Sequence, residues 1–276
     1  MQLFDFHIHS TCSDDAKDSM TDMALACAKA GIEVVCFTDH FDLDDYRTGE
    51  PISDPLAVWP TVLQQYAEAK AACEGIIDLR LGMELGEANH NPALAARCAA
   101  QPELDFVLGS THNLRSTTDF YYLQYQSLDH CYALLDTYMA ELLELAALDC
   151  FDCMSHIGYT RRYMLAAGYD AVITLDRYGD QLDQIYRTLI QNGRGIEINC
   201  SGFRHPGIAT SIPDLPLLKR YRELGGEIIT IGTDAHRLSD VGLFLREGYE
   251  LLAEAGFRYV CLYRNRTPEF IKLDRI

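Results

Sequence analysis

The sequence predicts an α/β barrel in which mostly parallel strands form a closed sheet and helices cover its outside. Short apolar runs alternate with helix-length segments along the chain, which is the order that builds a parallel sheet from βα units. Histidines and carboxylates follow nearly every one of these runs. A barrel brings all its strand ends to one mouth, whereas a doubly wound open sheet, the structural alternative, places its ligand at one switch point. The spread of polar residues over many strand ends therefore favours the barrel.

Each predicted strand is an apolar run of the kind found in buried parallel strands. The runs are LFDFHIH (3–9), VVCFTDH (34–40), LRLGMEL (79–85), FVLGSTH (106–112), DCMSHIG (152–158), GIEINCS (195–201), IITIGTDAH (228–236) and YVCLY (259–263). Patterned helical segments lie between them at 21–31, 56–73, 134–148, 181–193 and 216–226. Gly31, Gly193 and Gly225 are placed to end three of these helices. No repeat or linker interrupts the chain, so one domain over residues 1–276 is expected.

Composition limits the partners of the protein. The chain is 48% hydrophobic, enough for a large core, and its formal net charge is −18. Nucleic acid or an anionic membrane would need a basic surface, so neither partner is expected. No apolar run has the length of a membrane span and the first residues lack a signal-peptide pattern, which predicts a cytoplasmic protein. The ten cysteines, including the pair Cys150 and Cys153, are therefore expected to be free buried thiols.

The opening segment LFDFHIHSTCSDDA indicates a metal site. His7 and His9 are two residues apart on a predicted strand, so both side chains lie on one face. The other polar residues at strand ends are Asp39, His40, Glu84, His112, His156, Asn199, Asp234 and His236. One ion takes roughly four to six ligands, so a set of this size predicts two or three metal ions in the mouth of the barrel.

The motifs HIH, TDH, GMELG, GSTHN, SHIGY and GTDAH occur in this order along the chain. In this they resemble the polymerase-and-histidinol-phosphatase (PHP) family, and more closely its histidinol-phosphate phosphatase branch. The resemblance extends over essentially the whole chain. It implies a distorted (β/α)7 TIM-like barrel that holds a trinuclear cluster of divalent ions such as Zn, Mn or Fe.

The resemblance also implies which residues hold each ion. The first ion would be held by His7, His9, Glu84 and Asp234. Glu84 would bridge to a second ion, held with His112 and His156, and the third would use Asp15, His40 and His236. The family often has histidine at the position of Asp15, so this chain departs from the pattern and Asp14 is an alternative ligand. Asp39 is expected to support a ligand histidine rather than bind an ion.

The expected reaction is hydrolysis of a phosphate ester. The sequence has no G-x-S-x-G, no P-loop and no G-x-G-x-x-G after a strand, so a covalent enzyme intermediate is disfavoured. A metal-bound hydroxide is the expected nucleophile, with Glu84, Asp234 and His236 at the reacting centre. The resemblance implies L-histidinol phosphate as substrate and histidine biosynthesis as pathway.

Arginines are the expected phosphate ligands, because a guanidinium contacts two phosphate oxygens at once. Arg161 or Arg162, which follow His156, is expected to act with Arg204, although the doublet could instead be solvated at a helix start. Asp42, in an acidic and aromatic loop, is expected to contact a cationic group of the substrate.

The three remaining histidines lie outside the strand-end pattern. His205 is expected to face the mouth, and either it or a metal-bound water would be the general acid. His90 and His130 are expected on the surface.

Four other functions are weighed against this one. A relative could act on a nucleotide or a sugar phosphate. A PHP-type nuclease or polymerase module is disfavoured by the acidic charge. A metal-binding scaffold without activity would be expected to lose ligands, and this chain keeps the set. An amidohydrolase also begins with H-x-H, but it often uses a bridging lysine, and no strand-end lysine is evident.

Overall fold

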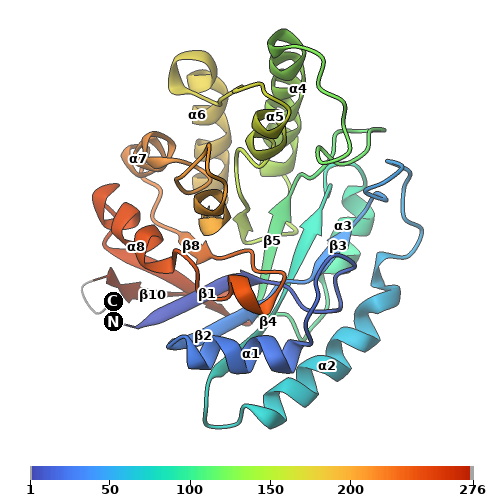
Figure 1. The fold of residues 1–276 in the computed structure, drawn as a ribbon, viewed down its shortest axis with the longest axis vertical. Helices are drawn as coiled ribbons and strands as arrows, with labels where there is room; N and C mark the ends of the chain where they lie inside the picture. The colour runs from blue at the N-terminus through green and yellow to red at the C-terminus, as the bar shows by residue number, and fades with distance from the viewer. Residues whose placement is uncertain (1, 274–276) are drawn as a thin grey trace.

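The computed structural model of the protein describes residues 2–273. One eight-stranded parallel sheet forms its centre (Figure 1). The sheet runs in the order β1 (Leu3–Ile8), β2 (Ile32–Phe37), β4 (Asp78–Gly86), β5 (Phe106–Ser110), β6 (Cys153–Met154), β7 (Gly195–Asn199) and β8 (Ile229–Gly232), and β3 (His40–Asp42) pairs with the end of β4.

The sheet closes on itself between its first and last strands. The amide of Asp234 donates to the carbonyl oxygen of His7 at 2.7 Å, and the amide of His9 donates to that of Ala235 at 2.9 Å. The buried Asp5 carboxylate adds two hydrogen bonds, from the amide and the hydroxyl of Thr233. The predicted α/β class and the distorted TIM-like barrel are confirmed, and the closing seam includes three predicted ligands, His7, His9 and Asp234.

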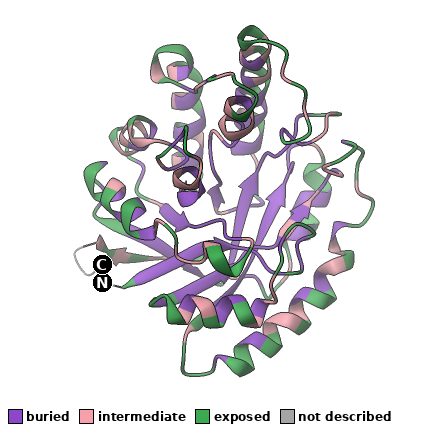
Figure 2. Cartoon of the chain, viewed as in Figure 1, coloured by how far each residue is buried: buried purple, intermediate pink, exposed green. Residues whose placement is uncertain are grey.

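Helices cover the outside of the barrel and turn their buried faces toward the strands (Figure 2). They are α1 (Met20–Lys29), α2 (Trp59–Ala72), α3 (Pro92–Ala99), α4 (Leu128–Ala146), α5 (Arg161–Ala166), α6 (Leu175–Gln191), α7 (Leu215–Glu223) and α8 (Leu245–Glu254), with short 3-10 turns at Pro55–Val58, Cys200–Arg204 and Leu238–Asp240. Gly31, Gly193 and Gly225 have φ of +83°, +68° and +97°, so the predicted helix ends are confirmed. None of the described helices is long and apolar enough to cross a membrane.

Two of the predicted helices start earlier than expected, and three helices were not predicted. Helices α4 and α6 begin after Ser127 and Thr174, whose side chains accept hydrogen bonds from the amides of His130 and Arg177. Such side chains supply an acceptor to the unpaired amides of the first turn. Helices α3 and α5 have only eight and six residues, too few for a long apolar period. Helix α8 has a buried stripe at helical spacing, Leu245, Gly248, Tyr249 and Leu252, so its signal was present in the sequence and was missed.

The run predicted at 259–263 is a strand but not a barrel strand. It forms β9 (Tyr259–Arg264), which pairs antiparallel with β10 (Thr267–Lys272) in a separate hairpin. The amides of Asn265 and Arg266 donate to Asp105, which precedes β5, and the Tyr263 ring lies 4.8 Å from that of Phe106. The hairpin therefore packs against the amino ends of the strands, opposite the predicted site.

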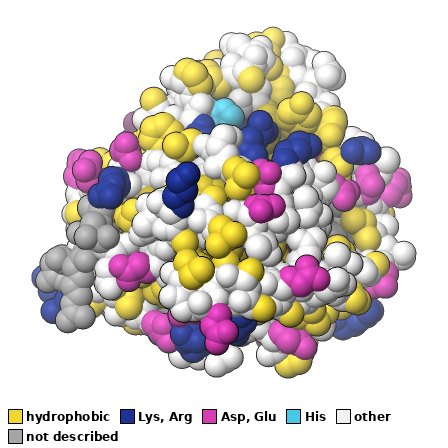
Figure 3. Space-filling view, turned by 60° about the horizontal axis from the view of Figure 1, so that its bottom comes forward, with side chains coloured by type: hydrophobic (Ala, Val, Ile, Leu, Met, Phe, Trp, Pro, Cys, Tyr) yellow, Lys and Arg dark blue, Asp and Glu magenta, His cyan; other side chains and the backbone are white. Residues whose placement is uncertain are grey.

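Barrel strands such as β1 and β5 are buried at every residue, as in parallel sheets covered by helices. Each large apolar side chain removed from water contributes about 1.5–3 kcal/mol, so the core holds the strand ends in fixed positions. All ten cysteines are free and buried, as predicted. Acidic and basic side chains are interspersed on the face drawn in Figure 3.

Candidate metal centre

Glu84 lies at the centre of the mouth, near the end of β4, with no exposed surface. Its Oε1 atom is 3.1 Å from His112 Nε2 and 2.9 Å from His156 Nε2. Its Oε2 atom is 3.2 Å from His7 Nε2 and 3.5 Å from His9 Nε2. One carboxylate thus joins two pairs of histidines, which is the arrangement of a bridging ligand.

The first predicted ligand set is brought together completely. His7 on β1 and His9, just after the end of β1, have their Nε2 atoms 3.1 Å apart. Oδ1 of Asp234 lies 3.8 Å from the first of these nitrogens and 3.6 Å from the second. Asp234 has φ of +56°, a backbone conformation that non-glycine residues adopt at a cost and that turns its carboxylate into the mouth.

The third set gathers at the rim. His236 Nε2 lies 3.4 Å from His40 Nε2, and both approach Asp15, at 3.3 Å and 3.8 Å. Asp15 is the exposed member, with 62% of its side chain open to solvent. Of the two adjacent aspartates it is Asp15, rather than Asp14, that the structure places against these histidines.

Some nitrogen and oxygen atoms of this centre lie close together without a hydrogen bond between them, which fits a metal ion better than a shared proton. Nδ1 of His40 and Oε2 of Glu84 are 3.0 Å apart and buried, yet neither makes a hydrogen bond. Burial would raise the pKa of Glu84, but His7, His112 and His40 hold it well below its usual range. Imidazole nitrogens and ionised carboxylates are the ligands of Zn and related divalent ions. The donor set therefore fits a metal centre.

The PHP domain family model matches residues 5–201, more than half of the chain. The chain belongs to the PHP family. It is 27% identical over 261 residues to a probable histidinol-phosphatase of Clostridium acetobutylicum, covering 94% of this chain and 96% of that protein. It is 25% identical over 271 residues to a histidinol-phosphatase of Lactococcus lactis, covering 95% of each.

Solved structures share the same PHP fold. Histidinol phosphate phosphatase from Lactococcus lactis, in complex with Zn, L-histidinol and phosphate, superposes with a TM-score of 0.79 at 24% identity and covers 97% of this chain and 99% of that one. A putative histidinol phosphatase from Listeria monocytogenes gives 0.75 at 14% identity, with 88% and 99% covered.

Two acidic residues support the predicted ligands of the metal centre. Glu197 is buried on β7, with Oε1 2.6 Å from Nδ1 of His7 and Oε2 accepting the amide of His156 at 2.9 Å. Asp39 accepts hydrogen bonds from Ser13 Oγ at 2.7 Å, and Ser13 Oγ lies 3.1 Å from Nδ1 of His9. Such groups orient metal-binding imidazoles. Glu197 was missed by the sequence reasoning, although a glutamate in the middle of the apolar run GIEINCS was a signal.

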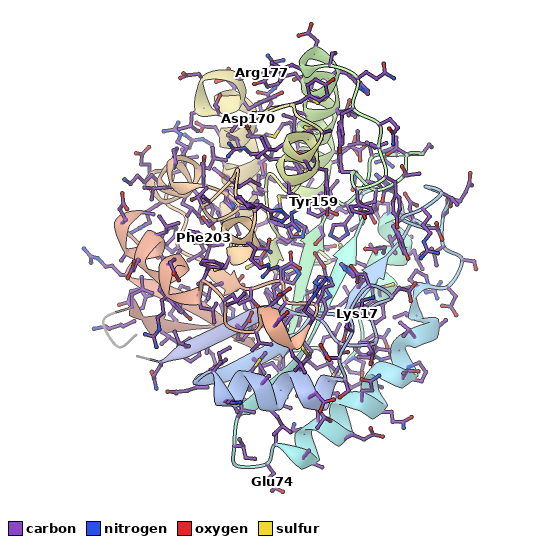
Figure 4. The ribbon with its side chains drawn as sticks, in the orientation of Figure 1. Lys17, Glu74, Tyr159, Asp170, Arg177 and Phe203 are labelled. Carbon is purple, nitrogen blue, oxygen red and sulfur yellow. The ribbon has the colours of Figure 1, made fainter. Side chains whose placement is uncertain are left out.

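The two adjacent arginines, Arg161 and Arg162, point to different places: Arg162 lies in the mouth of the barrel and Arg161 lies outside it. Arg162 donates to Ser201 Oγ at 2.8 Å and lies 3.4 Å from Asp234, and its buried Nε has no partner. Arg161 instead donates to Asp170, which Figure 4 shows beyond α5, away from Tyr159 (Figure 4). Of the two, Arg162 has the position expected of a phosphate ligand.

The other predicted substrate contacts take positions around the PHP centre. Arg204 donates to the backbone oxygens of Thr233 and Asp234 at 2.6 and 3.0 Å, so it holds the turn that carries a ligand. Asp42 Oδ1 lies 3.2 Å from Nδ1 of His112. Burial, with Arg162 and Arg204 nearby, lowers the pKa of His205 to about 4, which favours the neutral imidazole and disfavours a role as general acid.

The prediction that His90 is a surface residue is wrong. Only 7% of its side chain is exposed, and it lies between Asp44, 2.6 Å from Nδ1, and Glu141, 2.7 Å from Nε2. His130, at the start of α4, is half-buried. The carboxylates around His90 come from a loop after β3 and from α4, so no local pattern marked them as its neighbours.

Proposed function

We propose that this protein is a metal-dependent phosphatase that hydrolyses L-histidinol phosphate to L-histidinol and phosphate. The observation that carries the proposal is the buried Glu84 shared by five histidines, with the guanidinium of Arg162 beside Asp234 in the same mouth. The relatives named histidinol-phosphatases match nearly the full length of the chain, which supports the same activity here.

The proposed ligand sets are those predicted above, for two or three divalent ions of Zn, Mn or Fe. When bound, such ions lower the pKa of a water molecule, hold phosphoryl oxygens and stabilise the leaving oxygen. The residues themselves set the geometry: Glu84 and Asp234 supply fixed negative charge in the mouth, and Glu197 holds the His7 ring with Nε2 directed inward.

Arg162 is the residue we propose for phosphate binding. Its Nη2 atom donates to Ser201 and lies 3.4 Å from Asp234, which holds the guanidinium in the mouth, and 10% of the side chain is exposed. A guanidinium has five N–H donors, so donors remain beyond those used by Ser201 and Asp234, and a phosphate oxygen is a suitable acceptor for them. His205, being neutral, can give or accept one hydrogen bond near the substrate.

The test is phosphate release by protein purified with its native metals. Histidinol phosphate is assayed beside nucleoside monophosphates, sugar phosphates and single-stranded DNA, with Glu84→Gln as the inactive control. We expect kcat/KM for histidinol phosphate to exceed that for each other substrate. Equal or faster turnover of another phosphate would contradict the assignment, and bound metal without turnover of any substrate would indicate a scaffold.

A further inference from the structure

Tyr159 contacts three of the groups just described without being a metal ligand or a phosphate ligand itself. Its ring centroid lies 4.8 Å from Cζ of Arg162, 5.1 Å from the His112 ring and 5.0 Å from the His156 ring. The residue is buried, and Figure 4 shows it at the mouth, where side chains from several strand ends converge. One ring therefore packs against the proposed phosphate ligand and two proposed metal ligands.

The hydroxyl group of Tyr159 is held from the other side. It donates to the buried carboxylate of Asp119, at 3.0 Å and 3.2 Å from its two oxygens, and accepts the hydroxyl of Tyr163 at 3.1 Å. Asp119 is itself fixed, because its Oδ1 accepts the amide of Tyr121 and its own amide donates to the carbonyl oxygen of Tyr46. The ring position is therefore determined by a chain of hydrogen bonds across two loops.

We propose that Tyr159, fixed by Asp119, is a positioning residue that holds the Arg162 guanidinium at the angle needed to bind the substrate phosphate. A guanidinium over an aromatic face is attracted by the ring, and burial strengthens this attraction. Ser201 and Asp234 hold one edge of the Arg162 guanidinium and the Tyr159 ring lies against its face, so the guanidinium is fixed from two sides. The inference rests on the proposed function only in taking a phosphate group as the ligand.

Binding of inorganic phosphate to the metal-loaded protein, measured by isothermal titration calorimetry, tests this role without a turnover assay. Tyr159→Leu removes the ring, and we expect phosphate to bind about tenfold more weakly or worse, as when a group that orients a ligand is removed. Tyr159→Phe keeps the ring but loses the Asp119 bond, so a smaller loss of about threefold is expected. Tyr186→Phe, a buried tyrosine on α6 whose hydroxyl has no partner, is the matched control and should bind as wild type does.

A double-mutant cycle decides whether Tyr159 acts through Arg162. In an Arg162→Met background, we expect Tyr159→Leu and Tyr159→Phe to change phosphate affinity by less than about twofold. Equal losses with and without Arg162 would overturn the proposal, and so would wild-type affinity in both single variants. If the leucine variant does not fold, the same comparison is made with the phenylalanine variant alone, and the same two outcomes would overturn the proposal. Bound metal is measured in every variant, so a loss caused by missing ions is recognised as such and counts against the proposal.

The same variants separate this inference from the proposed function. If wild-type protein binds inorganic phosphate but does not turn over histidinol phosphate, the substrate assignment is wrong. The double-mutant cycle of Tyr159 and Arg162 still tests the positioning role in that case, because it measures phosphate binding only. If histidinol phosphate is turned over, Tyr159→Phe should raise KM more than it lowers kcat. A fall in kcat alone would contradict a role in holding the phosphate ligand.

Discussion

The carboxyl end of the barrel contains two buried clusters of histidine and carboxylate that balance their charges differently. In the smaller one, each ring nitrogen of His90 has its own carboxylate, Asp44 at 2.6 Å and Glu141 at 2.7 Å. In the larger one, imidazole nitrogens face each other and share Glu84. In the first cluster, a proton on each His90 nitrogen gives every nitrogen a hydrogen bond to a carboxylate. In the second cluster, more imidazole nitrogens converge than the carboxylate oxygens can pair by hydrogen bonds. Residue type alone therefore does not distinguish a structural histidine from a ligand; the number of acceptors per nitrogen does.

Among variants that test this difference between the His90 cluster and the Glu84 cluster, Glu84→Gln is expected to have the largest effect. The amide keeps the shape of the side chain but removes the charge shared by five histidines. We expect activity to fall by more than about 100-fold, beyond the effect of losing a group that only orients a ligand, and bound metal to fall with it. Elemental analysis and phosphate release measure both. The matched control is Glu223→Gln on the exposed surface of α7, which should leave both unchanged.

Glu197→Gln should give the next largest effect. Its carboxylate accepts from His7 at one oxygen and from the His156 amide at the other, and a glutamine would turn a donor toward one of them. We expect metal affinity to fall by about 10–100-fold, measured by titration against a competing chelator. Unchanged affinity would mean that the orientation of His7 is set by the backbone alone.

His90→Gln should affect stability while leaving bound metal unchanged. It removes charged hydrogen bonds to two buried carboxylates, so the free energy of unfolding should fall by about 2 kcal/mol. Urea unfolding of the metal-loaded protein measures this change. A loss of metal as large as that of Glu197→Gln would show that the two clusters are one functional unit.

The smallest expected effect is the pH dependence of the difference in unfolding free energy between wild type and His90→Gln. Burial would lower the pKa of His90, but the hydrogen bonds to Glu141 and Asp44 raise it above its usual value. Since the folded pKa is above the unfolded one, the stabilisation is complete below about pH 6.5 and is lost as the pH rises through the folded pKa. The difference in unfolding free energy between wild type and His90→Gln should therefore decrease at alkaline pH. A constant difference would mean that His90 is not protonated in the fold.

The sequence predicted the barrel and the gathering of histidines and carboxylates at its mouth because strands and strand ends are local patterns, whereas the assignment of residues to individual ions came from the resemblance to the PHP family. An apolar run followed by His or Asp, as in IITIGTDAH, can be recognised within a few residues of sequence. The parallel topology then brings the strand ends together at one mouth. Glu197, His90 and the hairpin were not predicted correctly because their roles depend on distant partners. The His7 contact of Glu197 spans 190 positions, and the Glu141 contact of His90 spans 51. Nothing local distinguished the run at 259–263 from a barrel strand.

The seam that closes the barrel also has a consequence for the order in which the protein is translated and completed. Thr233, which bonds to Asp5 across this seam, lies 228 positions after it, and the next residue, Asp234, completes the set that begins with His7. A nascent polypeptide on the ribosome lacks this last carboxylate until nearly all of the chain has been translated. Under the proposed ligand assignment, the first site would therefore be completed only late in translation, and a prematurely terminated product would lack one of its ligands.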